Sequence, residues 1–263
     1  MHEQEAAAHG LRCEYRLIDV EDRQTTGASL RELLETAERK GFAGLNVTHP
    51  FKLSVVPLLH ELSRESRVLG AVNTIVFRHG LRVGHNTDWC AFRESFRETL
   101  PDAALNRVVQ LGAGGAGAAT AYAALEMGAA HVTVIDAAPD RARELASRLA
   151  ESFPASRIEA SDDLSSGLAQ ATGLIHATPT GMASHPGSAV PASLLRPDVW
   201  VADVVYFPIE TELLRAARAI GCRTMNGGGM AVYQAAEAFR LFTGRRADVK
   251  RMRQFFDQAD PAA

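Results

Sequence analysis

The segment from Val108 to Asp136 constrains the fold more than any other part of the sequence. It reads as a buried strand, a glycine-rich turn, a helix and a second strand that ends in an acid. Gly112, Gly114 and Gly117 occupy the three glycine positions of the dinucleotide fingerprint. Asp136 stands where a carboxylate would hold the ribose hydroxyls of adenosine. This order of elements predicts a Rossmann-type nucleotide-binding domain.

Each glycine of the fingerprint has a separate physical reason. The first permits the tight turn, the second lets the backbone approach a pyrophosphate, and the third lets the helix pack closely on the strand. The helix that follows would direct its N–H groups and the positive end of its dipole at the phosphates. The alternative is a tight strand–helix turn that binds nothing. We expect cofactor contacts from Gly112, Ala113, Gly114, Gly115, Ala116 and Gly117.

Composition excludes several classes of protein. The chain has 263 residues, 46% of them hydrophobic and 22% charged, which is ordinary for a globular protein. Its net charge of −3 gives no footprint for nucleic acid or an anionic membrane. Cys13, Cys90 and Cys222 are scattered, and the histidines lack ligand spacing, so we expect no disulfide framework and no metal. No apolar run reaches the ~18 residues of a membrane span, so we expect a cytoplasmic protein without membrane contact.

Strands and helices alternate after residue 107, which predicts βα units on a parallel sheet. The strands are expected at 107–111, 131–136, 157–160, 173–177 and 199–205, and the helices between them at 116–128, 139–152, 163–171 and 209–220. Further helices are expected at 229–243 and 247–257.

The first hundred residues follow a different pattern. Helical periodicity covers 29–40, where Ser29 is a plausible N-cap, and a hairpin turn is expected at 78–80 between strands 71–77 and 81–83. The other expected elements are helices at 1–10, 51–62 (despite Pro57) and 88–100, and strands at 15–19 and 42–47.

Polar side chains collect near strand ends in three segments outside the fingerprint, at 46–52, 73–74 and 86–88. Three more segments carry distinctive motifs: Ala-Thr-Pro-Thr-Gly-Met at 177–182, Asp-Val-Val-Tyr-Phe-Pro at 203–208 and Gly-Met-Ala-Val-Tyr-Gln at 229–234. Together with the fingerprint, they resemble the shikimate dehydrogenase family, and within it the NAD-dependent quinate/shikimate dehydrogenases. The resemblance covers nearly the whole chain.

The resemblance implies an α/β protein of two domains with a cleft between them. A substrate domain would comprise both chain ends, 1–103 and 227–263, and a Rossmann-type NAD domain would comprise 104–226. Lys52 and Asp88 would be the catalytic pair. Thr48, Asn73, Gln234 and Tyr206 would contact a cyclohexane carboxylic acid. Further cofactor contacts would come from Arg141, Thr178, Pro179, Thr180, Met182, Val204 and Met230.

Residue chemistry supports Lys52 independently. Oxidation of a secondary alcohol requires a proton acceptor near the hydroxyl, and a lysine amine can titrate whereas arginine cannot. Only three of the 28 basic residues are lysines, so Lys52 stands where this chain more usually has arginine. The alternative is a solvated lysine at a helix start. Asp88 could likewise be a helix N-cap, and both roles are compatible.

Asp136 favours NAD over NADP, because a carboxylate accepts hydrogen bonds from a free 2′-hydroxyl and repels a 2′-phosphate. Arg141 and Arg143 are close enough in sequence to offset that repulsion, although Arg141 also suits adenine stacking or a solvated helix face.

The chain departs from the family at its start. Relatives begin with a strand and a Ser-x-Ser or Ser-x-Thr segment that holds the substrate carboxylate, and Met1 lies beyond that position. Either a misassigned start codon leaves this segment out of the given sequence, or the substrate domain lacks its first strand. We expect a monomer or a homodimer. Two alternatives to a quinate/shikimate dehydrogenase stay open: an enzyme for an amino-substituted shikimate, and an NAD-binding sensor without turnover.

Overall fold

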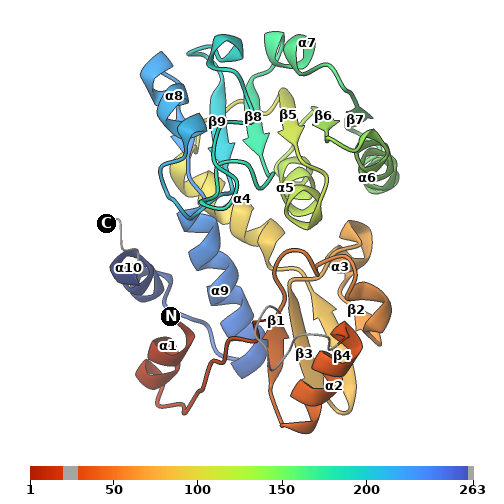
Figure 1. The fold of residues 1–263 in the computed structure, drawn as a ribbon, viewed down its shortest axis with the longest axis vertical. Helices are drawn as coiled ribbons and strands as arrows, with labels where there is room; N and C mark the ends of the chain where they lie inside the picture. The colour runs from red at the N-terminus through yellow and green to blue at the C-terminus, as the bar shows by residue number, and fades with distance from the viewer. Residues whose placement is uncertain (20–28, 260–263) are drawn as a thin grey trace. The chain divides into compact units, whose positions relative to one another are not determined.

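The chain forms two compact units in the computed structural model, which describes residues 1–19 and 29–259 (Figure 1). One unit comprises Met1–Thr87 and the chain from Gln234 onward, and the other comprises Asp88–Tyr233. We call them the terminal unit and the central unit, after their places in the sequence. The boundaries predicted at 103/104 and 226/227 divide the chain by what each part binds. They stay predictions, because the compact units are defined by contacts within the chain and not by ligand binding.

The central unit alternates strands and helices, as predicted. Its elements are α4 (Asp88–Thr99), β5 (Arg107–Leu111), α5 (Gly115–Glu126), β6 (His131–Ile135), α6 (Pro139–Ser152), β7 (Arg157–Ala160), α7 (Leu164–Ala169), β8 (Gly173–His176), the 3-10 turn η2 (Ala192–Leu194), β9 (Trp200–Asp203), α8 (Glu212–Ile220), β10 (Thr224–Met225) and the first part of α9 (Gly228–Thr243). The sequence analysis did not predict η2 or β10. For the other elements the predicted boundaries differ by three residues at most; α8, for example, begins at Glu212 instead of residue 209.

The six strands form one parallel sheet in the order β10-β9-β8-β5-β6-β7. This is the strand order of a Rossmann domain, and it confirms the predicted fold class. The order reverses between β5 and β8, which end at Leu111 and His176. Open parallel sheets bind ligands at the carboxyl ends of the strands that flank this reversal.

Packing explains why the glycine-rich helix α5 lies on the sheet. Nine of its residues are buried, most of them alanine or glycine, and the helix contacts β5, β6 and α4. Small side chains on all sides let α5 approach the sheet on one side and α4 on another closely. On adjacent strands, Gly173 makes room for Trp200, because a Cβ at Gly173 would overlap the indole ring. The indole N–H donates to the carbonyl of Ala104 at 2.8 Å.

The terminal unit has its own four-stranded sheet in the order β1-β3-β4-β2. Its elements are α1 (His2–Ala8), α2 (Leu30–Arg39), β1 (Gly44–Asn46), the 3-10 turn η1 (Val56–Leu58), β2 (Glu61–Leu62), α3 (Arg64–Leu69), β3 (Thr74–Arg78), β4 (Leu81–His85), the second part of α9, and α10 (Val249–Ala259). Ser29 caps α2 through a capping box with Glu32, as its position predicts.

The predicted hairpin joins β3 and β4. His79 and Gly80 both have positive φ, 52° and 73°, which is the geometry of a two-residue type I′ turn.

Two predictions for the terminal unit are wrong. Residues 51–62 form turns, the short η1 and β2 instead of a helix. Pro57 lacks an N–H donor and disfavours helical geometry at Val56, so the helical periodicity of this stretch does not produce a helix. Residues 15–19 form no strand, although their composition favours one. Tyr15 instead donates its N–H to Glu3 and its hydroxyl to Asn46.

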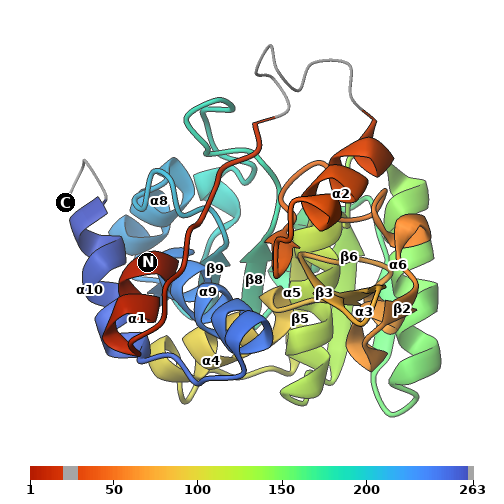
Figure 2. The same cartoon turned by 90° about the horizontal axis from the view of Figure 1, so that it is seen from below.

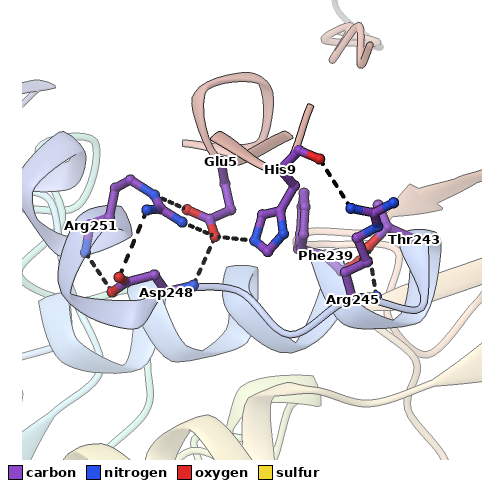
Figure 3. A network of polar contacts seen from close by, with 7 residues as sticks. All are labelled: Glu5, His9, Phe239, Thr243, Arg245, Asp248 and Arg251. Atoms are coloured by element: carbon purple, nitrogen blue, oxygen red, sulfur yellow. Dashed lines mark hydrogen bonds and ion pairs between the residues drawn. The ribbon is translucent and has the colours of Figure 1, made fainter. Parts of the chain in front are cut away.

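The helices near the two chain ends lie side by side in the terminal unit, α1 against α10 (Figure 2). Glu5 of α1 is fully buried and joins them (Figure 3). Arg251 of α10 donates two hydrogen bonds to the carboxylate, Nε to Oε2 at 2.7 Å and Nη2 to Oε1 at 2.9 Å. The N–H of Asp248 and the ring of His9 bond to Oε1 at 2.8 and 2.9 Å.

Candidate dinucleotide and substrate sites

The glycine turn after β5 has the geometry that a dinucleotide needs. Gly112 has a φ of 96°, and a Cβ there would lie 2.5 Å from the carbonyl oxygen of Ala177. A Cβ at Gly117 would overlap the carbonyl of Gly112. Gly114 differs, because its φ is −76° and a Cβ would meet no described atom within 4 Å. The fold itself requires the first and third glycines, whereas the second leaves room for a ligand to approach the backbone.

A buried glutamine, which the sequence analysis did not single out, supports this turn. Gln110 is fully buried on β5, and its amide donates to the carbonyl of Gly112 at 3.1 Å. The hydroxyl of Thr120, one turn into α5, donates to Gln110 Oε1 at 2.9 Å. These bonds tie strand, turn and helix together. The signal available in the sequence is a lone amide inside an apolar strand.

Asp136 follows β6 and lies against the glycine turn. Its Oδ2 accepts the N–H of Ala113 at 2.7 Å, and its Oδ1 accepts the N–H of Ala138 at 2.8 Å. Each carboxylate oxygen can accept a further hydrogen bond, so this arrangement is compatible with ribose hydroxyls as additional donors. Arg141 is exposed on α6, and Arg143 pairs with Asp140 at 2.6 Å. The carboxylate of Asp136, with free acceptor capacity, and the exposed Arg141 therefore fit the adenosine end of a dinucleotide.

The other predicted cofactor residues follow β8 and β9 or lie in α9. Thr178 to Met182 form the loop directly after β8, in which Pro179 and Met182 are exposed. Val204 directly follows β9 and donates its N–H to the carbonyl of His176 at 3.0 Å. Met230 is buried in the first turn of α9.

His176 and Asp203 form a buried pair in the same part of the sheet. They end neighbouring strands in register, and their Nδ1 and Oδ1 atoms lie 2.9 Å apart. The other ring nitrogen of His176 lies 2.5 Å from the hydroxyl of Thr178. The spacing of the histidines in the sequence gives no sign of this pair. Asp203 is 27 residues away from His176 and only the sheet register brings it close.

In the terminal unit, Asn73 lies within a network of hydrogen bonds. It is almost fully buried just before β3, and its Oδ1 accepts the hydroxyl of Thr74 at 3.1 Å and the N–H of Thr87 at 2.8 Å. Its Nδ2 donates to the hydroxyl of Thr87 at 2.9 Å. Asn46 donates to Thr74 at 3.2 Å and continues the network to the end of β1. The side chain of Asn73 is thus held in one orientation.

Three other predicted substrate residues belong to the terminal unit. Thr48 is exposed in the turn after β1, where its carbonyl accepts the N–H of Phe51 at 2.9 Å. Lys52 is half-buried, and its carbonyl accepts the N–H of Val72 at 2.8 Å. Gln234 of α9 is half-buried, and its carbonyl accepts the hydroxyl of Thr87 at 3.2 Å.

Two predicted residues belong to the central unit. Asp88 is the first residue of α4 and is buried, in the first helical turn where a carboxylate is favoured by the helix dipole. Tyr206 lies in the segment after β9 and is about half exposed (51%).

Neither a metal cluster nor a membrane helix is found in the described parts of the chain. No group of three His, Cys, Asp or Glu residues in 1–19 and 29–259 could hold a metal ion. Over the same residues, no helix has the length and hydropathy to cross a membrane.

Comparison with known proteins covers both units. Residues 1–75 match the shikimate dehydrogenase substrate binding domain, 227–254 match the shikimate 5′-dehydrogenase C-terminal domain, and 97–196 match the alanine dehydrogenase/PNT C-terminal domain.

Full-length relatives are similar along nearly the whole chain. A shikimate dehydrogenase (NADP⁺) of Streptomyces avermitilis is 56% identical over 96% of this chain and 87% of its own length. A quinate/shikimate dehydrogenase (NAD⁺) of Corynebacterium efficiens is 48% identical over 97% of this chain and 91% of its own. The solved structure of quinate dehydrogenase from Corynebacterium glutamicum in complex with NAD matches with a TM-score of 0.90 and 46% identity, covering 98% of this chain and 92% of that one. The chain therefore belongs to the shikimate dehydrogenase family of oxidoreductases that act on a CH–OH group.

Proposed function

We propose that this protein interconverts quinate or shikimate with the corresponding 3-dehydro acid and uses NAD as the hydride carrier. The observation that carries the proposal is the carboxylate of Asp136 beside the glycine turn, in a chain whose relatives include NAD-linked quinate/shikimate dehydrogenases. The functional domains proposed are 1–103 with 227–263 for the substrate and 104–226 for the cofactor.

Sequence identity alone does not decide between the two cofactors. The Streptomyces relative at 56% identity is named for NADP⁺, and the Corynebacterium relative at 48% is named for NAD⁺. The chemistry of Asp136 supports NAD, because its carboxylate can accept the 2′-hydroxyl of the ribose and would repel a 2′-phosphate. Arg143 is already paired with Asp140, which weakens its case as a phosphate ligand.

The turn, the strand ends and α9 would together hold the cofactor. Gly114 lets the pyrophosphate approach the backbone, and the N–H groups at the start of α5 face it. Thr178, Thr180, Met182, Val204 and Met230 would hold the nicotinamide half, and Arg141 the adenine. When bound, NAD supplies the acceptor for the hydride.

The residues of this chain would handle the proton and the substrate. Lys52 would take the proton of the reacting hydroxyl as hydride leaves the same carbon, so that the alcohol becomes a ketone. Asp88 would bind that hydroxyl and hold the lysine amine. Asn73, in its fixed orientation, would bind a ring hydroxyl together with Thr48, and Gln234 and Tyr206 would complete the site. The chemistry of a small polyhydroxylated acid fits this set of donors and acceptors.

The experiment that tests the proposal is an assay of NADH formation with purified protein. Quinate, shikimate and an amino-substituted shikimate are each offered with NAD and with NADP. We expect turnover of quinate or shikimate, with a higher kcat/KM for NAD. If only the amino-substituted shikimate is turned over, that compound is the substrate and not quinate or shikimate. If the protein binds NAD but turns over none of the acids, it is a sensor. Either result overturns the proposal.

We also propose a cytoplasmic enzyme that is a monomer or a homodimer. Cys13, Cys90 and Cys222, which all lie in the described parts of the chain, form no disulfide with one another, which suits a reducing compartment. Light scattering after size-exclusion chromatography distinguishes the two assembly states.

A further inference from the structure

Three side chains form a continuous buried path across the ends of β8 and β9. Asp203 and His176 are 0% and 1% exposed, and the path ends at the hydroxyl of Thr178. Within the central unit it connects two neighbouring strands to the loop that follows β8.

The hydrogen bonds at Asp203 fix the protons along this path. Its Oδ2 accepts the hydroxyl of Thr211 at 2.7 Å, and its Oδ1 accepts the N–H of Val205 at 3.0 Å. An ionised carboxylate only accepts hydrogen bonds. In its contact with Oδ1, Nδ1 of His176 is therefore the donor and carries the proton. In the neutral ring, Nε2 is then an acceptor, and the hydroxyl of Thr178 donates to it.

Thr178 is therefore held on two sides. Its hydroxyl oxygen lies 2.5 Å from Nε2 of His176 and accepts the N–H of Thr180 at 3.3 Å. Its methyl group faces the glycine turn, because a Cβ at Gly112 would lie 3.2 Å from Thr178 Cγ2. The loop after β8 is thus fixed against the turn after β5. These two segments flank the reversal of strand order, where Rossmann domains bind their ligand.

We propose that Asp203 and His176 are positioning residues, which hold Thr178 and the loop 178–182 against the glycine turn and thereby determine how tightly the dinucleotide binds. This inference rests on the proposed function, since it concerns the same cofactor. His176 and Asp203 act through Thr178 and need not touch the cofactor.

Thr178→Val is the direct test, because valine keeps the shape of threonine and removes only the hydroxyl. The matched control is Thr172→Val at the opposite edge of the same sheet, where the Thr172 hydroxyl bonds to the N–H and the carbonyl of Arg107. Each variant removes two hydrogen bonds from the hydroxyl of a half-buried threonine. We expect Thr178→Val to raise the Kd for NAD about ten-fold while Thr172→Val leaves it unchanged. The KM for the acid should be unchanged in both, because its proposed ligands belong mostly to the terminal unit.

A conservative variant separates the hydroxyl from the methyl group. Thr178→Ser keeps the hydroxyl and should bind NAD within about two-fold of the unmutated protein. If Thr178→Val does not fold, Thr178→Ala serves in the same comparison with Thr178→Ser. Nitrogen-15 spectra of the histidine ring give a further readout, with His176 assigned by its loss in His176→Asn. We expect the Nδ1–H tautomer.

The outcomes separate this inference from the proposed function. If the unmutated protein does not bind NAD, the proposed function fails and takes the inference with it. If the unmutated protein binds NAD and Thr178→Val binds it equally well, the inference alone is wrong. An Nε2–H tautomer at His176, or a Thr178→Ser variant as weak as Thr178→Val, also overturns it. A purely structural role would lower the melting temperature of both valine variants and leave the Kd for NAD unchanged.

Discussion

At the residue scale, Lys52 is the most direct test of the proposed proton transfer. Lys52→Ala should lower kcat by about 10²–10⁴-fold, the usual contribution of a general acid or base. The Kd for NAD should hardly change, because Lys52 belongs to the terminal unit and the glycine turn to the central unit. Lys52→Arg should be nearly as impaired, since guanidinium keeps the charge but does not titrate. Steady-state kinetics and NAD titration measure both effects.

The chain provides a control for this substitution. Lys40 is exposed at the end of α2, so Lys40→Ala should retain full activity. An unchanged kcat in Lys52→Ala would show that Lys52 does not take the proton of the reacting hydroxyl.

Asp136 determines cofactor preference in the proposal, and its hydrogen bonds dictate which variant to use. Alanine would release the N–H groups of both Ala113 and Ala138, whereas asparagine keeps the shape, removes the charge and releases only one of these N–H groups, because its amide has a single acceptor oxygen. Asp136→Asn should narrow the preference for NAD over NADP about ten-fold, the effect of roughly 1.4 kcal/mol. The ratio of kcat/KM values for the two cofactors measures it. Glu151→Gln, at an exposed acid near the end of α6, is the control and should leave the ratio unchanged.

Prediction from sequence located correctly in the fold those residues whose position depends on local spacing; their roles stay predictions. Gly112, Gly117 and Asp136 lie within one strand–turn–helix–strand unit, so their spacing is sufficient to place them. His176 and Gln110 depend on neighbours across the sheet or on the following helix, and a single sequence does not contain the register that pairs His176 with Asp203.

At the scale of elements, the glycine turn can be tested without any assay of turnover. Gly114→Ala should leave the melting temperature unchanged, because its φ of −76° suits alanine and the added methyl meets no described atom within 4 Å. It should still weaken NAD binding, since the methyl would occupy the space that the pyrophosphate needs. Calorimetry and NAD titration on the same sample separate the two effects.

Gly117→Ala is the matched comparison within the same turn. Its methyl would overlap the carbonyl of Gly112, so we expect a loss of stability as well as of binding. Equal NAD affinity in Gly114→Ala and the unmutated protein would place the pyrophosphate elsewhere.

The elements that sequence predicted correctly have strong local signals. The capping box at Ser29 and the hairpin turn at 79–80 are examples, as is the strand–helix alternation after residue 107. The predictions of a helix at 51–62 and of a strand at 15–19 were wrong for opposite physical reasons. In the first, Pro57 outweighs helical periodicity. In the second, the local preference for a strand is present, but a strand also needs a hydrogen-bonding partner along its backbone.

At the scale of the molecule, the terminal unit depends on contacts between segments more than 240 residues apart, such as Glu5 with Arg251 (Figure 3). Burial alone would raise the pKa of Glu5, but the hydrogen bonds from Arg251, Asp248 and His9 outweigh burial and lower the pKa from 4.5 to about 2. The folded unit therefore binds this proton less readily than the unfolded chain does. The stabilisation is complete above pH 4.5 and is lost as the pH falls toward 2.

Glu5→Gln should consequently lower the free energy of unfolding at pH 7 by about 1–2 kcal/mol. The effect is smaller than for a fully buried ion pair, because Arg251 is one-third exposed and also pairs with Asp248. The substitution should also remove most of the decline in stability between pH 4.5 and pH 2 that this carboxylate causes. Urea unfolding at several pH values measures both effects. Glu14→Gln is the control, since Glu14 and Arg16 form an ion pair with both side chains exposed, and such pairs contribute little. If Glu5→Gln and Glu14→Gln have the same small effect at pH 7, the contact between α1 and α10 does not hold the chain ends together.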